Sequence, residues 1–352
     1  HQALSSLDAT PTAATIVLHG DSVAARDIAS LQAYSSITSI DGHLIKSISG
    51  TLSEITDALS ALIVKPEFIR LELDAGEVLA EDLLSLNEKY RIQSIDGTGL
   101  SLLQGVAGSV LRALSSLTVP PNSCTIILEP GNNKATDIVE LLAQPGVGSV
   151  DGADVRTLSG SSMALLQVLA SVSVKPTAAT LLLADSSISA ADIIAMDLHP
   201  SVRTIDGRSI RLIDGTATDI LEVLTKITNR SGSISVTISD APSLEKLKAI
   251  NQLTDGAIIV NDATVLIGGP ASDILDAFQG ITNYRGDVTV STPISIAQLN
   301  SLRNITSGVI RYDSIADTGA NLKENAALGA TSSLGEGIVV LPLGNLSIAQ
   351  AL

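Results

Sequence analysis

Aromatic side chains are scarce in this sequence. They make up 2% of the 352 residues, and there is no tryptophan. Because 45% of the residues are nevertheless hydrophobic, any core must be built mainly from aliphatic side chains. This composition favours many thin, similar layers over one large globular centre.

Cysteine and long apolar runs are also lacking. Cys124 is the single cysteine, so no disulfide can form within the chain, and we interpret it as a buried, unreactive thiol. No run of about 18 or more apolar residues occurs, so the sequence predicts no membrane span.

Basic residues are few. The 21 lysines and arginines face 37 acidic residues, which gives a net charge of −16. This balance argues against a nucleic-acid partner, because phosphate backbones are bound by clustered basic side chains. It is typical of a well-solvated surface, or of one that meets cations.

What the sequence does contain is a repeated motif, Ile/Val-Asp-Gly. Its aspartates are separated by 55 residues each time (96 − 41, 151 − 96 and 206 − 151) and are Asp41, Asp96, Asp151 and Asp206. A constant period of this size indicates a repeat architecture. The period predicts repeats at 15–68, 69–123, 124–178, 179–233, 234–286 and, less regularly, 287–336, with 1–14 the end of a preceding repeat and 337–352 the start of a seventh. Both ends then cut across a repeat, which we interpret either as a cleavage boundary or as part of an array that continues.

Each repeat predicts the order strand–helix–strand–strand–helix. In the first repeat, apolar runs and helical spacing place these elements at 15–18, about 23–31, 37–40, 44–48 and 52–62. Asp21 or Ser22 is expected to cap the first helix, and Thr51 or Ser53 the second. Asp-Gly is a turn dipeptide, so Asp41-Gly42 predicts either a hairpin or a corner between two coils.

Such a unit is too small to bury its own apolar face, so neighbours must cover it. We therefore predict an α/β repeat solenoid of about 55-residue units with a mostly parallel sheet. The alternative is a row of tandem small α+β domains. A sheet that crosses the boundaries between repeats would favour the solenoid.

In a solenoid, Asp41, Asp96, Asp151 and Asp206 would form a line of carboxylates. Such a line repels itself unless it is hydrogen-bonded or bridged by cations, and calcium is the natural bridge outside a cell. These four residues are therefore candidate calcium ligands, with a turn-forming role as the favoured alternative. Different melting curves with and without a chelator would indicate calcium binding.

No catalytic arrangement is evident, and we predict no enzyme activity. Gly20-Asp21-Ser22 resembles an esterase nucleophile block, but the same loop recurs with other residues in later repeats, as caps would. The histidines show no metal-ligand spacing; they are His1, His19, His43 and His199.

One patch departs from the repeat pattern. The second repeat gathers acidic residues that we interpret as a solvated face or as a binding surface: Glu67, Glu72, Asp74, Glu77, Glu81, Asp82 and Glu88.

The segment 294–299, followed by 308–322 with its Tyr-Asp-Ser-Ile-Ala-Asp-Thr-Gly-Ala-Asn-Leu run, resembles the repeats of large secreted bacterial proteins, many of them cyanobacterial, described as hemolysin-like or calcium-binding. Gly319 stands where those repeats usually carry alanine. The resemblance implies an extracellular or cell-surface location and transfers no catalytic residue.

We therefore expect a non-enzymatic structural protein that self-associates head to tail into a fibril, sheath, surface layer or adhesin stalk. The alternative is a module of a secreted adhesin that binds surface proteins or glycans.

Overall fold

The structure is a computed structural model that describes residues 13–260, 267–281, 284–322 and 338–340. The chain divides into two units, His1–Leu181 with Pro200–Arg203, and Leu182–His199 with Thr204–Leu352. Most of the predicted partial repeats at 1–14 and 337–352 lies outside the described residues.

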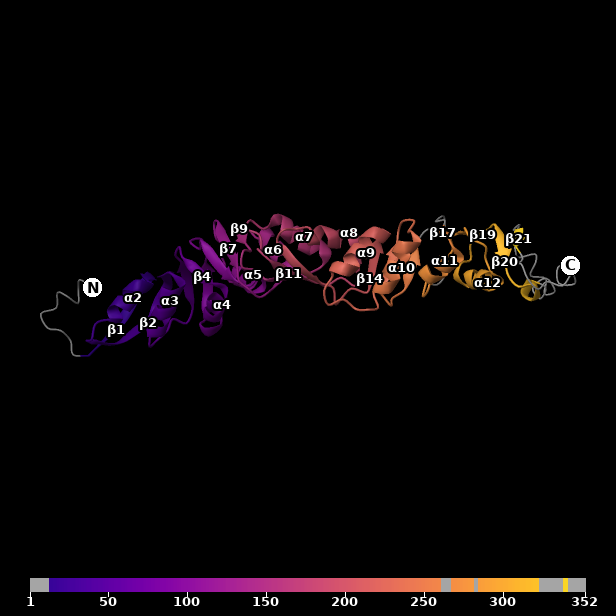
Figure 1. The fold of residues 1–352 in the computed structure, drawn as a ribbon. Coiled ribbons are helices and arrows are strands. Elements are labelled where there is room, and N and C mark those ends of the chain that lie inside the picture. Colours follow the sequence, from indigo (N-terminus) through magenta and orange to yellow (C-terminus); the bar gives the residue numbers. More distant parts are fainter. Residues whose placement is uncertain (1–12, 261–266, 282–283, 323–337, 341–352) are drawn as a thin grey trace. The chain divides into compact units, whose positions relative to one another are not determined.

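The first unit alternates short strands and helices (Figure 1). Its elements are β1 (Ala14–Ala24), α2 (Ala25–Gln32), β2 (Ile37–Gly50), α3 (Leu52–Ala61), β3 (Ile69–Leu73), β4 (Glu77–Leu79), α4 (Ala80–Lys89), β5 (Ile92–Asp96), β6 (Leu102–Gly105), α5 (Ala107–Ser116), β7 (Cys124–Leu128), β8 (Asn132–Lys134), α6 (Ala135–Ala143), β9 (Val147–Asp151), β10 (Thr157–Gly160) and α7 (Ser162–Ser171).

The second unit continues this alternation. Two strands, β11 (Ala179–Leu183) and β13 (Val202–Asp206), contain points where the chain passes from one unit to the other. The remaining elements are β12 (Ser187–Ser189), α8 (Ala190–Asp197), β14 (Leu212–Gly215), α9 (Ala217–Lys226), β15 (Ser235–Ile238), α10 (Leu244–Leu253), β16 (Ile258–Val260), β17 (Ile267–Gly269), α11 (Ala271–Ala277), β18 (Val288–Val290), α12 (Ile296–Ile305), β19 (Ile310–Tyr312), β20 (Ser314–Ala316) and β21 (Ile338–Val340).

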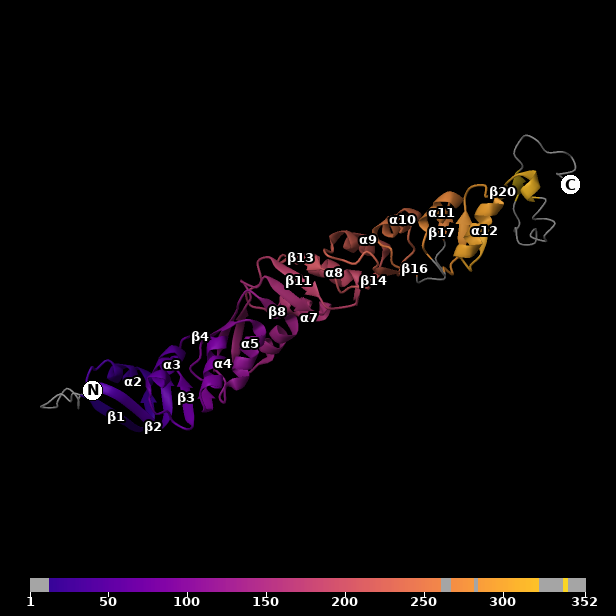
Figure 2. The ribbon, with the colours of Figure 1, turned by 90° about the horizontal axis from the view of Figure 1, so that it is seen from below.

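Parallel pairing joins the strands within each unit. The first unit contains the sheets β1-β2-β3-β5 and β4-β6-β7-β9, and the second contains β12-β14-β15-β16 and β17-β18-β19. Parallel neighbours need a crossover connection, and in most cases a helix supplies it. Consecutive helices in turn pack against one another, as α4 does on α5 and α9 on α10 (Figures 1 and 2). The chain is therefore an α/β protein of repeated strand–helix units, as the sequence predicted.

The predicted order of elements is incomplete. A second short strand precedes the first helix of the repeat where the sequence indicated a loop, and these strands are β4, β8 and β12. Each repeat is therefore two successive strand–strand–helix halves. Three-residue strands show too little alternation to be recognised in a sequence, because their partner strand defines them.

The predicted cap of the first helix is wrong. Gly20, Asp21 and Ser22 lie within β1, and α2 begins at Ala25 after Ala24, which makes no side-chain cap. The predicted cap of the second helix is confirmed at Thr51. Its Oγ1 accepts a hydrogen bond from the Glu54 amide, and the Glu54 carboxylate accepts one from the Thr51 amide.

The Asp-Gly dipeptides form corners, and the hairpin alternative is wrong. Asp41-Gly42 lies inside the single strand β2, which runs through both strands predicted there. One repeat later, β5 and β6 flank the dipeptide but belong to different sheets. The chain therefore passes from one sheet to the next at Asp96-Gly97, and at neither dipeptide does it fold back on itself.

A glycine–alanine contact recurs between neighbouring turns of the chain. Gly50, Gly105, Gly160 and Gly215 have φ angles of 155° to 158°, which favour glycine. A Cβ atom on each would lie 2.9–3.1 Å from an alanine Cβ atom 25 residues earlier (for example 105 − 80). These alanines begin four helices and are fully buried: Ala25, Ala80, Ala135 and Ala190. Strand and helix therefore approach closely at equivalent points of successive repeats.

Candidate functional site

The four repeated aspartates all make the same local turn. A carboxylate oxygen of each accepts a hydrogen bond from the backbone amide two residues later. These donors are His43 for Asp41 (3.0 Å), Thr98 for Asp96 (3.0 Å), Ala153 for Asp151 (2.9 Å) and Arg208 for Asp206 (3.1 Å). This geometry is the Asx turn expected of a turn-forming aspartate.

The glycine after each aspartate has a different role from the expected one. None of these four glycines has a positive φ angle. A Cβ atom on Gly42 would lie 2.6 Å from Leu62, one on Gly97 2.7 Å from Leu117, and one on Gly207 2.2 Å from Ile227. At these three positions an added Cβ atom would therefore clash with the residue that ends the following helix, whereas at Gly152 the nearest atom, the Val174 carbonyl oxygen, would lie 3.2 Å away.

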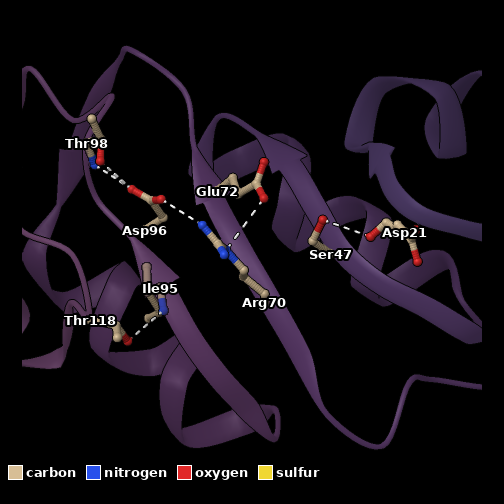
Figure 3. A network of polar contacts seen from close by, with 8 residues as sticks. All are labelled: Asp21, Ser47, Arg70, Glu72, Ile95, Asp96, Thr98 and Thr118. Atoms are coloured by element: carbon tan, nitrogen blue, oxygen red, sulfur yellow. Dashed lines mark hydrogen bonds and ion pairs between the residues drawn. The ribbon is translucent and has the colours of Figure 1, made fainter.

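The side chains around the aspartates are mostly basic or hydroxyl groups. In Figure 3, Arg70 lies between Glu72 and Asp96, with Nη2 3.0 Å from Asp96 Oδ2, and Thr98 Oγ1 donates to Asp96 Oδ1. Asp41 Oδ1 lies 2.7 Å from His43 Nδ1. The hydrogen bonds from Thr98 and from His43 lower the pKa of Asp96 and of Asp41, respectively.

Asp206 is the most buried of the four, with 3% of its side chain exposed. Arg208 donates to both of its carboxylate oxygens, and Asn229 Nδ2 donates to Oδ2 at 2.8 Å. The hydrogen bonds from Arg208 lower the pKa of Asp206 to about 2.

The surroundings of three of these aspartates favour the turn-forming role, and calcium binding stays a prediction. Calcium is coordinated by six to eight oxygen atoms. Asp96 and Asp206 are instead paired with arginine guanidinium groups, and Asp41 with an imidazole nitrogen. Within the described residues, no group of three or more histidine, cysteine, aspartate or glutamate side chains is close enough to share a metal ion.

The other candidate residues are dispersed. Asp21 is paired with Lys46 (2.6 Å), and both side chains are largely exposed. Cys124 is fully buried at the start of β7, and burial raises the pKa of its thiol to about 11, so the thiolate form is strongly disfavoured. His19 lies in β1 and His199 follows α8, while His1 lies outside the described residues.

The acidic patch of the second repeat spreads over β3, β4, α4 and the segments beside them. Glu72 faces Arg70 (Nε to Oε1, 3.6 Å). Glu81 accepts a hydrogen bond from Ser109 and lies 3.8 Å from Arg112. Part of the patch is therefore neutralised by Arg70 of the same strand and by Arg112 of α5.

The remaining part of the patch borders a cleft between α3 and α4. The cleft has a volume of about 540 Å³. Leu52, Val78 and Leu86, which are nearly fully buried, contribute apolar atoms to its lining. Asp57, Glu77 and Asp82 are exposed carboxylates that line it, and Lys89 and Tyr90 contribute from the C-terminal end of α4.

Sequence reasoning identified Glu77 and Asp82 but missed Asp57, because Asp57 belongs to the preceding repeat. The period gives little signal for it. Asp82 is matched by Asp137 and Asp192 in the following repeats, whereas Asp57 is followed by Arg112, Gln167 and Glu222. The charge at this position therefore varies from repeat to repeat.

Comparison with known proteins gives no match: no family profile, curated protein or solved structure is significantly similar to this chain. Among the described residues, no helix is both long enough and apolar enough to cross a membrane.

Proposed function

We propose that this chain is a non-enzymatic structural protein whose 55-residue repeats stack as an α/β solenoid. The observation that carries the proposal is that sheets are shared between repeats. The sheet β4-β6-β7-β9 takes two strands from the predicted repeat 69–123 and two from 124–178. The sheets β1-β2-β3-β5 and β12-β14-β15-β16 are divided between repeats in the same way. In a row of separate small domains, each sheet would contain strands of one repeat only.

The same arrangement supports head-to-tail self-association. Because each sheet is completed by the next repeat, a repeat without a successor leaves a strand edge unpaired. Unpaired edges pair readily with another chain. Such stacking would extend the protein into a fibril, sheath, surface layer or adhesin stalk, and the resemblance in 294–322 supports an extracellular or cell-surface location.

Sedimentation velocity over a range of protein concentrations, with negative-stain electron microscopy of the same samples, tests the proposal. We expect concentration-dependent oligomers that lengthen along one axis at constant width. Single chains at every concentration would contradict head-to-tail stacking. Immunolabelling of intact cells tests the location, and labelling only after lysis would contradict it.

A further inference from the structure

A small pocket lies where the loop between α3 and β3 meets the C-terminal end of α4. Its volume is about 230 Å³. Lys65 and Glu67 line it from the loop, and Lys89, Tyr90 and Arg91 line it from the last residue of α4 and the two residues that follow. Three basic side chains thus gather around one pocket of a chain whose net charge is −16.

The chain's own carboxylates do not neutralise these basic side chains. Within the described residues, Lys65, Lys89 and Arg91 form no ion pair, whereas Arg70 in the adjacent strand β3 contacts two carboxylates. Lys65 Nζ donates a hydrogen bond to the Leu62 carbonyl oxygen (3.1 Å), which places the ammonium group at the end of α3. Because an ammonium group has three donors, it can still bind a further acceptor. All three positive charges are therefore available to an anionic ligand.

Aromatic side chains, which are rare in this chain, occur at the same place. Tyr90 lines the pocket, and Phe68, at the end of the same loop, is 58% exposed, whereas the other phenylalanine, Phe278, is buried. The Tyr90 hydroxyl lies 3.3 Å from Ser60 Oγ, and Lys89 Nζ lies 5.3 Å from the centroid of the Tyr90 ring. These contacts hold the ring beside a positive charge. A pocket that joins basic and aromatic side chains is suited to a ligand with both an anionic group and an apolar face.

The combination is not a feature of the repeat in general. At the positions equivalent to Lys89-Tyr90-Arg91, the other repeats have Tyr-Ser-Ser at 34–36, Gln-Pro-Gly at 144–146 and His-Pro-Ser at 199–201. Lys65, by contrast, recurs two repeats later as Lys175, whose Nζ likewise donates to carbonyl oxygens near the end of the preceding helix. The lysine therefore serves the repeat itself, whereas the basic and aromatic residues that accompany it are specific to this pocket.

We propose that this pocket binds an acidic saccharide through one sugar unit that bears a carboxylate or sulfate group. Lys65, Lys89 and Arg91 pair with the acidic group, and the guanidinium group of Arg91 can bind such an oxyanion through two parallel hydrogen bonds. Tyr90 presents apolar ring surface to the carbon atoms of the sugar. Glu67, the one carboxylate among the lining residues, accepts hydrogen bonds from the sugar hydroxyl groups.

The chemistry of the pocket selects this ligand over others. An inorganic anion would leave Tyr90 unused and would be repelled by Glu67, and a neutral sugar would leave the three positive charges unpaired. A long polyanion is disfavoured because the rest of the chain is acidic. The size of the pocket suits a single sugar unit, since drug-sized ligands occupy pockets of about 300–1,000 Å³. The proposal does not depend on head-to-tail stacking, which uses strand edges.

Ligand-observed NMR titrations of the full chain at low ionic strength test the proposal. The probes are a galacturonate disaccharide, a sulfated galactose disaccharide and the neutral galactose disaccharide. The test variant is Lys65→Gln/Arg91→Gln. The matched control, Lys134→Gln/Lys175→Gln, removes the same charge elsewhere in the same unit and also removes a lysine that bonds the end of a helix.

We expect at least one acidic disaccharide to bind the native chain, and the choice between them identifies the acidic group as carboxylate or sulfate. The test variant should bind it about tenfold more weakly, as for the loss of two exposed charge pairs, and the control should bind it as the native chain does. Melting temperatures show whether each variant is folded. Should the double variant unfold, Arg91→Gln alone replaces it, because this exposed side chain has no partner within the part of the chain that the structure describes.

Four outcomes would overturn the proposal. Binding of neither acidic disaccharide would show that the pocket takes no acidic saccharide. Equally tight binding of the neutral disaccharide would show that the positive charges are not used. Displacement of the saccharide by inorganic sulfate at an equal concentration would indicate a site for an adventitious ion only. Equal weakening by the test and control variants would indicate general attraction to positive charge.

Discussion

At the scale of single residues, the glycine–alanine contact is the most constrained feature of the repeat. Gly105 combines a φ angle of 157° with a Cβ position only 3.1 Å from the Ala80 Cβ atom. The substitution Gly105→Ala should therefore lower the free energy of unfolding by about 1–3 kcal/mol, because it adds backbone strain to a steric clash. Urea unfolding followed by circular dichroism measures the change.

Gly76→Ala is the matched control. Gly76 has no positive φ angle, and its added Cβ atom would lie 3.8 Å from the nearest atom, Thr51 Cγ2. We expect it to change stability by less than about 0.5 kcal/mol. Equal effects of the two substitutions would contradict a special role for the glycine–alanine contact.

Asp206 should make stability depend on pH at the acid end. Its pKa in the folded chain is about 2, below the ordinary value of 3.8, so its ionised form stabilises the fold above about pH 4. That contribution is lost as the pH falls toward 2 and amounts to at most about 2 kcal/mol, because the Arg208 side chain remains exposed. Asp206→Asn should be less stable at pH 7 and lose less stability between pH 4 and pH 2.

Unfolding by urea at a series of pH values tests this expectation. The control is Asp276→Asn, since Asp276 is an exposed partner of Lys248 (3.4 Å) in the same unit. If the Asp206 variant lost stability on acidification as steeply as the native chain, the ion pair with Arg208 would not be the source of the dependence.

At the scale of single elements, the start of α3 depends on the capping box of Thr51 and Glu54. Thr51→Ala removes the side-chain acceptor of the Glu54 amide and should cost about 1 kcal/mol of stability. Ser53→Ala, an exposed neighbour on the same helix, should have little effect. Thermal melting compares the two, and an unchanged melting temperature for Thr51→Ala would show that α3 is held by its packing alone.

At the scale of the whole molecule, the repeat of 55 residues should be the unit that can be removed. Deletion of 69–123 joins Phe68 to Cys124 and brings together positions that are equivalent in successive repeats. We expect a folded chain with an unchanged circular dichroism signal per residue and a cooperative melt.

Deletion of only 69–91, one strand–strand–helix half, should not be tolerated. It removes β4, the edge strand of a sheet, together with Ala80, the contact of Gly105. After this deletion α3 would precede β6 in place of α4. Because α3 begins with Leu52, whose side chain is larger than that of alanine, the close contact with Gly105 could not form. A folded, cooperative half-repeat deletion would show that the shorter unit is the true structural repeat.

The sequence by itself determined the period, the aliphatic core and the turn at each Asp-Gly, because these depend on local residue types that recur at a constant spacing. It also located the Thr51 cap and the buried Cys124, since both follow from a short pattern. Only the tertiary structure decided which strands pair. Pairing joins residues such as Ser22 and Ser47 across a whole turn of the chain, so local sequence does not reveal the short strands β4, β8 and β12 or decide between the hairpin and the corner at Asp-Gly.

The same limit applied to the candidate site. The sequence shows which residues of the second repeat are acidic, but the interaction energy of two charges depends on their distance and surroundings. In the structure, Arg70 lies beside Glu72 and Arg112 beside Glu81. Asp57, from the preceding repeat, lines the same cleft as Asp82. The cleft exists because helices from two different repeats face each other there, and that arrangement is a property of the fold.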